Sequence, residues 1–381
     1  MTPEQIEARR AWLASLSEDG GPLTPNAPHA TINDRRYFQK VDGEAVPTPT
    51  RVRLHDEILR RWLRSQPDVQ ANRSAILMAG PPGAGKSSAH ESLFSGGDRT
   101  HWRELDSDVF KGYLLEAAIT DGSLQEMLPE NLRVSDQQGY FYPNELSALV
   151  HHESTELFAT AARDVIGRGD NLIIDGTMAW KPWAQELVDR LTAAGYSIQI
   201  VDVEAPQEVA AERIVSRWRQ GFLAAAADPG NPGAQMGGRW IPRAAVDGLF
   251  TDLRNHDGKP LHGKSVTEVN AREVSEESPS VTRYDLYRTK AVDRGADHIE
   301  RHERTAGSDL QLTWQAPDTL AAAGDASAPS VDSAVLGGLR AAGAAFPKRL
   351  GKVSRASESV DGPETSGPEL DPPGRDAGPE L

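Results

Sequence analysis

The chain has 381 residues, no cysteine, 38% hydrophobic residues and a formal net charge of −15. The lack of cysteine excludes disulfides, thiolate metal sites and a cysteine nucleophile. The negative charge argues against general binding to nucleic acid or to an anionic membrane. Because no apolar run is long enough for a membrane span and no signal peptide is recognisable, the sequence predicts a cytoplasmic protein.

Two helical patterns lie in the polar N-terminal segment, residues 1–72, which we predict to be a helical extension. The first pattern covers Pro3–Leu16 and the second covers Arg53–Arg64. We expect the second helix to pack on the main domain, although a helix that binds a partner protein would show the same pattern. Its apolar residues fall on one face, at Leu54, Ile58, Leu59 and Trp62.

Apolar strands alternate with helices in residues 73–265. Ser74–Ala79 is apolar without polar alternation, as expected for a parallel strand buried on both faces. Similar runs at Asn171–Ile174 and Ser197–Val203 end in acidic residues. The alternation predicts an α/β domain, namely a P-loop NTPase-type parallel sheet flanked by helices. The helical patterns cover Ser88–Phe94, Glu153–Ile166 and Pro182–Ala194.

The composition changes after residue 265. We predict a C-terminal extension at residues 266–305, in which Ser280–Arg288 has the pattern of an edge strand. Residues 306–381 are rich in Ala, Gly, Pro, Ser and Asp. Such a segment has too little apolar surface to offset the entropy lost on ordering, so we predict a disordered tail.

Gly80–Ser87 carries the pattern G-x-x-x-x-G-K-[ST] between a predicted strand and a predicted helix, which is the context of a phosphate-binding loop. Glycines let backbone N–H groups face phosphates, and the N-terminus of the helix favours negative charge. Lys86 would reach the β- and γ-phosphates of ATP, and the Ser87 hydroxyl would hold Mg²⁺. The predicted ATP-binding residues are Gly80, Pro81, Pro82, Gly83, Ala84, Gly85, Lys86, Ser87 and Ser88.

Carboxylates follow this loop along the chain. Asp106 and Asp108 stand two residues apart after the first helix of the domain. In a phosphoryl transferase, one carboxylate can accept the proton of the acceptor hydroxyl and another can help to hold Mg²⁺. Asp175 and Thr177 follow a strand, at the edge where open α/β sheets bind ligands. Helix caps and turns would explain the same residues without catalysis.

An arginine-rich stretch comes next. Arg213, Arg217 and Arg219 lie on a predicted helix, and Arg239 and Arg243 follow a segment rich in Ala, Gly and Pro. In an acidic protein, cations around such a segment suggest a mobile lid that brings positive charge onto the ATP phosphates. A solvated helix surface is the alternative interpretation of the helical arginines.

The sequence resembles the zeta-toxin family of UDP-N-acetylglucosamine kinases. The resemblance extends from Ser74 to Phe250 and rests on an ordered set of segments, namely GPPGAGKS, LDSDVFKGYL, NLIIDGT, SRWRQ and GGRWIP. It implies an enzyme that transfers the γ-phosphoryl group of ATP to the 3′-hydroxyl of a UDP-amino-sugar, with ATP and Mg²⁺ as cofactors. It further implies a toxin that a protein antitoxin holds in check.

The resemblance also implies roles for individual residues. Asp108 matches the general base, Lys86 and Ser87 match the ATP and Mg²⁺ residues, and Arg217 and Arg239 match two lid arginines that stabilise the transferring phosphoryl group. Glu153 lies at the start of a helix that resembles the substrate side of the family. We place four residues on the acceptor side, namely Asp106, Glu153, Asp175 and Thr177.

Two alternatives stay open at this point. The chain could be a P-loop kinase of a different acceptor, such as a nucleoside, a dinucleotide, a polynucleotide end or a protein. It could also be an ATP-regulated interaction protein whose terminal extensions bind partners, although such a switch would not need Asp108 or the lid arginines. The insert Asp121–Tyr142 and both extensions have no counterpart in compact family members.

Overall fold

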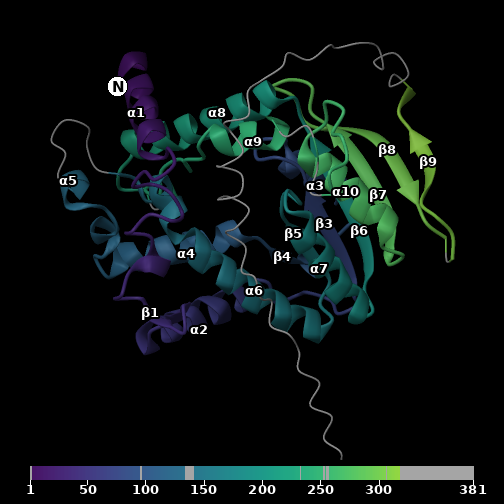
Figure 1. The fold of residues 1–381 in the computed structure, drawn as a ribbon, viewed down its shortest axis with the longest axis horizontal. Helices are drawn as coiled ribbons and strands as arrows, with labels where there is room; N and C mark the ends of the chain where they lie inside the picture. Colours follow the sequence, from purple (N-terminus) through teal and green to yellow (C-terminus); the bar gives the residue numbers. More distant parts are fainter. Residues whose placement is uncertain are drawn as a thin grey trace, which may run out of the picture. The chain divides into compact units, whose positions relative to one another are not determined.

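The computed structural model describes residues 2–94, 97–133, 141–231, 233–251, 254, 257–305 and 307–317. Within this described part, seven strands form one sheet in the order β4-β5-β3-β6-β7-β8-β9 (Figure 1). The strands from β4 to β7 run parallel, and β8 and β9 add antiparallel pairings. The predicted α/β fold is therefore confirmed, with two antiparallel strands as an addition. The strands are β3 Ser74–Ala79, β4 Arg103–Leu105, β5 Leu172–Asp175, β6 Ser197–Glu204, β7 Val281–Arg288, β8 Asp297–Glu303 and β9 Gln311–Gln315.

Strand β3 lies between β5 and β6 in the parallel part of the sheet. Its side chains alternate between two hydrophobic cores, because Leu77 joins one core while Ile76 and Met78 join the other. A strand with both faces covered needs apolar residues at successive positions, which explains the run SAILMA. The loop that follows β3 therefore starts from a fixed central strand.

Helices cover both faces of this sheet. Residues of α3, α8 and α9 contribute to one core, and residues of α4, α6, α7 and α10 contribute to the other. The three helices predicted in this region are confirmed, with ends shifted by one or two residues. None of the described helices is both long and apolar enough to cross a membrane. The helices are α3 Lys86–Leu93, α4 Ser107–Thr120, α5 Glu130–Arg133, α6 His151–Arg168, α7 Lys181–Ala193, α8 Gln207–Ala227, α9 Ala244–Thr251 and α10 Val266–Glu277.

The N-terminal segment contains α1 Pro3–Leu16, a hairpin of β1 Phe38–Val41 and β2 Glu44–Pro47, and α2 Pro49–Arg64. Both predicted helices are confirmed, and α2 begins four residues earlier than expected because Thr48 caps it and Pro49 suits its first position. Trp62 is 2% exposed, and its indole N–H donates to the carbonyl oxygen of Glu104 at 3.2 Å. The interpretation of α2 as a helix that packs on the main domain is therefore confirmed.

Two expectations for the C-terminal part are wrong. Strand β7 is not an edge strand, because it pairs with β6 on one side and β8 on the other. The sheet thus continues across the predicted boundary at residue 265. The predicted disordered tail from residue 306 includes Gln311–Gln315, which form β9 by pairing with β8. The rest of that tail, from residue 318, lies outside the described residues.

Candidate active site

The loop Gly80–Gly85 joins β3 to α3. Its glycines have positive φ angles, and a Cβ atom at Gly80 would lie 1.9 Å from the carbonyl oxygen of Val203. Helix α3 begins at Lys86 with Gly85 as its N-cap residue, so its first backbone N–H groups border the loop. The N-terminus of a helix and its dipole favour an anion at this end of α3. The predicted order of strand, glycine loop and helix is thus present, and phosphate binding by these residues stays a prediction.

The side chain of Lys86 lies over this loop. Its ammonium donates to the carbonyl oxygen of Gly80 at 3.1 Å and lies 3.8 Å from the carboxylate of Asp175. The backbone N–H of Gly80 donates to the carbonyl oxygen of Thr177 at 3.3 Å, so the segment after β5 borders the loop. Ser87 is exposed at the next position of α3. The ammonium of Lys86 and the carboxylate of Asp175 therefore lie together at the loop.

Asp106 and Asp108 lie at the start of α4. Asp106 caps this helix and accepts a hydrogen bond from the backbone N–H of Asp108 at 2.8 Å. One oxygen of Asp108 lies 3.0 Å from the ammonium of Lys111, and its other oxygen accepts from the guanidinium of Arg239. Two cations from different elements thus hold the predicted general base.

The pKa values of the two carboxyl groups are shifted in opposite directions. Burial and the neighbouring carboxylates of Asp108 and Asp175 raise the pKa of Asp106 to about 7. Burial acts in the same direction on Asp108, but Lys111 and Arg239 outweigh it and hold the pKa of Asp108 well below its usual range. Carboxyl groups whose pKa values are pushed apart are typical of functional sites.

The two predicted lid arginines line one pocket. Arg217 projects from α8, and Arg239 lies on the segment that follows this helix. A Cβ atom at Gly238 would lie 2.0 Å from the carbonyl oxygen of Trp218, so this segment crosses back over α8 at close range. The predicted lid is thus fixed at its base; its mobility stays a prediction. The pocket has a volume of about 390 Å³ and is lined by Asn144, Arg217, Gln220, Gly221, Gly237, Gly238 and Arg239.

Glu153 does not join this group. Its side chain is 0% exposed. The carboxylate makes two contacts with the guanidinium of Arg51, one of them at 2.8 Å, and one contact with the ring Nε2 of His55 at 2.6 Å. Burial would raise the pKa of Glu153, but the hydrogen bonds from His55 and Arg51 outweigh it and lower this pKa. The geometry therefore does not support the prediction that Glu153 contacts the acceptor, because Arg51 and His55 of α2 already bind its carboxylate.

Two residues at the site were absent from the prediction, and a third, Arg213, was predicted only as one of the helical arginines near the lid. Lys111 stands three positions after Asp108 on one helix face, which is a pattern that sequence reasoning could have used. Arg213 donates to the carbonyl oxygen of Ala84 in the loop at 3.3 Å, one helical turn before Arg217. The hydroxyl of Thr289 donates to the same oxygen at 2.6 Å, from 205 residues away, and no local pattern signals this contact. The hydroxyl of Ser88, a predicted ATP ligand, accepts from the backbone N–H of Ala296.

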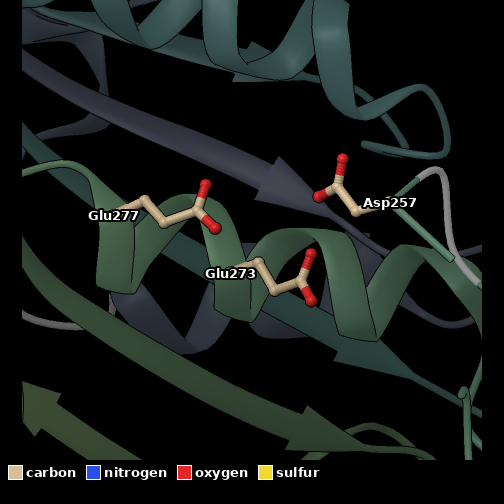
Figure 2. Close-up of side chains that lie close together, drawn as sticks. All are labelled: Asp257, Glu273 and Glu277. Atoms are coloured by element: carbon tan, nitrogen blue, oxygen red, sulfur yellow. The ribbon is translucent and has the colours of Figure 1, made fainter. Parts of the chain in front are cut away.

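A separate cluster of three carboxylates has the spacing of a metal site. Figure 2 shows Asp257, Glu273 and Glu277 with their carboxylates turned toward a common space. The ammonium of Lys181 lies 2.6 Å, 3.0 Å and 3.1 Å from these three groups. Burial would lower the pKa of Lys181, but its hydrogen bonds to these carboxylates raise it. The cluster therefore already holds a cation, and it surrounds none of the predicted site residues.

Comparisons with known proteins found one family model and several solved structures. The family model described as zeta toxin matches residues 59–259. A solved structure from the PezAT chromosomal toxin-antitoxin system of Streptococcus pneumoniae is 17% identical, covers 66% of this chain and 80% of its own, and gives a TM-score of 0.41. The AvrRxo1-ORF1:-ORF2 complex with ATP is 15% identical, with coverage of 74% and 78% and a TM-score of 0.44. No curated protein matches significantly.

The family match extends from α2 to the loop after α9 and so covers more than half of the chain. It includes the phosphate-binding loop, the ion pair between Asp108 and Arg239, and the carboxylate of Asp175 beside Lys86. On this evidence, the chain belongs to the zeta toxin family of ATP-dependent P-loop kinases.

Proposed function

We propose that the chain transfers the γ-phosphoryl group of ATP to the 3′-hydroxyl of a UDP-amino-sugar, with UDP-N-acetylglucosamine as the expected acceptor. One observation carries the proposal: Asp108 is held between Lys111 and Arg239, and Arg239 lines the same pocket as Arg217. A carboxylate next to cations is the arrangement expected where a hydroxyl is deprotonated beside charged phosphates.

In this mechanism the loop and Lys86 bind and orient the phosphates of ATP. Asp108 accepts the proton of the acceptor hydroxyl as the oxygen attacks the γ-phosphorus, and ADP leaves. Arg239 occupies one oxygen of Asp108 in this structure. We therefore propose that the guanidinium moves to the phosphoryl oxygens when ATP binds, which frees that oxygen of Asp108 and raises its basicity.

Mg²⁺ fits the residues around the loop. The Ser87 hydroxyl, with the carboxylate of Asp106 or Asp175, offers the oxygen donors that Mg²⁺ prefers. When bound, the ion would offset charge on the phosphates. The pKa of Asp106, about 7, would fall next to a divalent cation, because an opposite charge favours the ionised form.

The acceptor would lie next to the phosphate loop. Asp175 and Thr177 border this loop, and the pocket beside Arg217 is large enough for part of a sugar nucleotide. Family membership also supports a toxin that a protein antitoxin restrains in the cytoplasm. It disfavours the ATP-regulated interaction protein, which has no use for the pair of Asp108 and Arg239.

An acceptor screen tests this proposal. The full chain is incubated with Mg²⁺, γ-labelled ATP and a mixture of sugar nucleotides, nucleosides, dinucleotides and oligonucleotides, and the labelled products are separated. We expect label in UDP-N-acetylglucosamine and none with Asp108→Asn. Label in another compound alone would assign a different acceptor, and label in protein alone would assign a protein kinase.

A further inference from the structure

Each predicted lid arginine is followed by a buried tryptophan. Arg217 is exposed and Trp218 is 0% exposed, while Arg239 lines the pocket and Trp240 is 6% exposed. The rings of Trp218 and Trp240 meet edge to face, with centroids 5.5 Å apart. Because each cation and its neighbouring indole share one short stretch of backbone, whatever fixes the two indoles also fixes the positions of the two cations.

Both indole N–H groups are linked to the N-terminal segment, that of Trp240 directly and that of Trp218 through Glu145. Trp240 donates to the hydroxyl of Ser17, the C-cap residue of α1, at 2.9 Å. Trp218 donates to one carboxylate oxygen of Glu145 at 3.2 Å, and the other oxygen of Glu145 lies 2.5 Å from the guanidinium of Arg9 in α1. Helix α1 lies beside α8 in this arrangement (Figure 1).

The contact between Arg9 and Glu145 is buried on both sides. The two side chains are 5% and 0% exposed, and the guanidinium also lies 4.9–5.9 Å from the ring centroids of Trp12, Phe141 and Phe222. A buried ion pair adds little net stability relative to apolar residues, because removing both charges from water offsets their attraction. What it does supply is a fixed acceptor for the indole N–H of Trp218.

The backbone couples the two halves of the lid. A Cβ atom at Gly221 would lie 2.5 Å from the Cα atom of Gly238. The segment that carries Arg239 thus rests directly on the turn of α8 that follows Arg217. A small displacement of Trp218 would move this crossing and both cations with it.

We propose that α1 positions the phosphate-binding arginines, with Arg9 acting through Glu145 and Trp218 to hold Arg217 and Arg239 at the γ-phosphate position. Arg9 is thus a positioning residue that touches neither substrate. Helix α1 lies outside the family match at residues 59–259. The inference rests on the proposed function to the extent that the two arginines contact the γ-phosphate.

The test compares the affinities of the full chain for ATP and ADP, with Mg²⁺, by calorimetry. This readout needs no acceptor. Arg239→Ala should lower the ratio of ATP to ADP affinity at least about tenfold, as expected for the loss of a charged hydrogen bond to the γ-phosphate. Arg9→Met should lower the same ratio about three- to tenfold with little change in ADP affinity. A merely structural role would not distinguish the two nucleotides.

Two further variants keep the test decisive. Arg10→Ala, on the same helix but paired with Glu7 at the surface, should match the wild-type ratio. Because Arg9→Met leaves Glu145 buried and unpaired, a second variant replaces both residues with Met and restores charge balance. Its ratio should stay low even where its melting temperature recovers, since this double variant removes the acceptor of the Trp218 indole N–H.

The outcomes separate this inference from the proposed function. A wild-type ratio in both Arg9 variants, beside a lowered ratio in Arg239→Ala, would overturn the role of α1 alone. A wild-type ratio in Arg239→Ala as well would remove Arg239 from the γ-phosphate and overturn this inference together with the proposed movement of Arg239, while the acceptor screen tests the proposed function separately. The double variant of Arg9→Met and Arg239→Ala should lose less ATP preference, on a free-energy scale, than the sum of the losses in the two single variants. The reason is that Arg9 acts through the contact that Arg239 makes.

Discussion

The guanidinium of Arg239 donates a hydrogen bond to the carboxylate of Asp108 from 131 residues further along the chain. This contact joins the segment after α8 to the start of α4. It makes the predicted base and a predicted phosphate ligand partners of one another before ATP is present. ATP binding and activation of the base are therefore coupled in the proposed mechanism.

Replacing the predicted base should separate chemistry from nucleotide binding. Asp108→Asn removes the proton acceptor but keeps the size of the side chain, so transfer should fall about 10²- to 10⁴-fold while ATP affinity is retained. Initial rates and calorimetry measure the two quantities. Asp121→Asn, at the other end of α4, is the matched control. Loss of ATP binding, with normal transfer per bound ATP, would contradict the assignment.

Lys111 should set the acid limb of the pH–rate profile. Together with Arg239 it holds the pKa of Asp108 low, and a general base loses activity as the pH falls through its pKa. Lys111→Met should therefore raise that pKa and move the acid limb of kcat/KM to higher pH. Lys111→Arg should restore the wild-type limb. An unchanged limb in Lys111→Met would show that another group limits the rate at low pH.

Asp106 should make stability fall as the pH rises. Its pKa is raised to about 7 in the folded chain, so the folded state binds more protons than the unfolded state between about pH 4 and pH 7, and the free energy of unfolding decreases across that window. Asp106→Asn keeps a good helix cap and removes the charge. We expect this variant to exceed the wild type by an amount on the order of 1 kcal/mol at pH 8, with no excess at pH 4.

Denaturant unfolding at both pH values measures this difference. Thr48 caps α2, and its hydroxyl donates to the backbone carbonyl oxygen of Arg36, so it supplies a control cap without a titrating group. Thr48→Asn should therefore change the free energy of unfolding equally at pH 4 and pH 8. An Asp106→Asn variant less stable than the wild type at pH 8 would contradict the raised pKa.

The ion pair between Arg51 and Glu153 should be a stability determinant rather than a substrate contact. Arg51→Met leaves a carboxylate with 0% exposure beside His55 alone, and breaking such a buried pair costs about 3–5 kcal/mol. Arg53→Met, on an exposed face of the same helix, should change the free energy of unfolding by less than about 0.5 kcal/mol. Urea unfolding compares the two, and equal stability would contradict the role of the pair.

Local patterns were sufficient for part of this structure. The loop at Gly80–Ser87 and its flanking strand and helix are contiguous in sequence, so spacing and apolar periodicity predicted them. The Gly- and Pro-rich segment with arginines around it predicted a lid, and the family resemblance singled out Arg217 and Arg239 among them. The structure brings them to one pocket.

Contacts between distant segments could not be predicted in the same way. Glu153 meets Arg51 from 102 residues away, and Arg9 meets Glu145 from 136 residues away. No period or spacing encodes such pairs, because the tertiary packing of α1 and α2 determines them. Strand β7 is not an edge strand because β8 pairs with it and β9 pairs with β8. Both added strands are mostly polar, so no apolar pattern predicted them.

The central claim is phosphoryl transfer to one hydroxyl of a UDP-amino-sugar, and proton–phosphorus NMR of the product tests it most directly. With the full chain, ATP, Mg²⁺ and UDP-N-acetylglucosamine, we predict ADP and a new phosphate monoester in equal amounts, with phosphorus coupled to the proton at the 3′ carbon of the sugar. ADP formation without a phosphorylated sugar nucleotide, or a phosphate on any other hydroxyl, would contradict the claim.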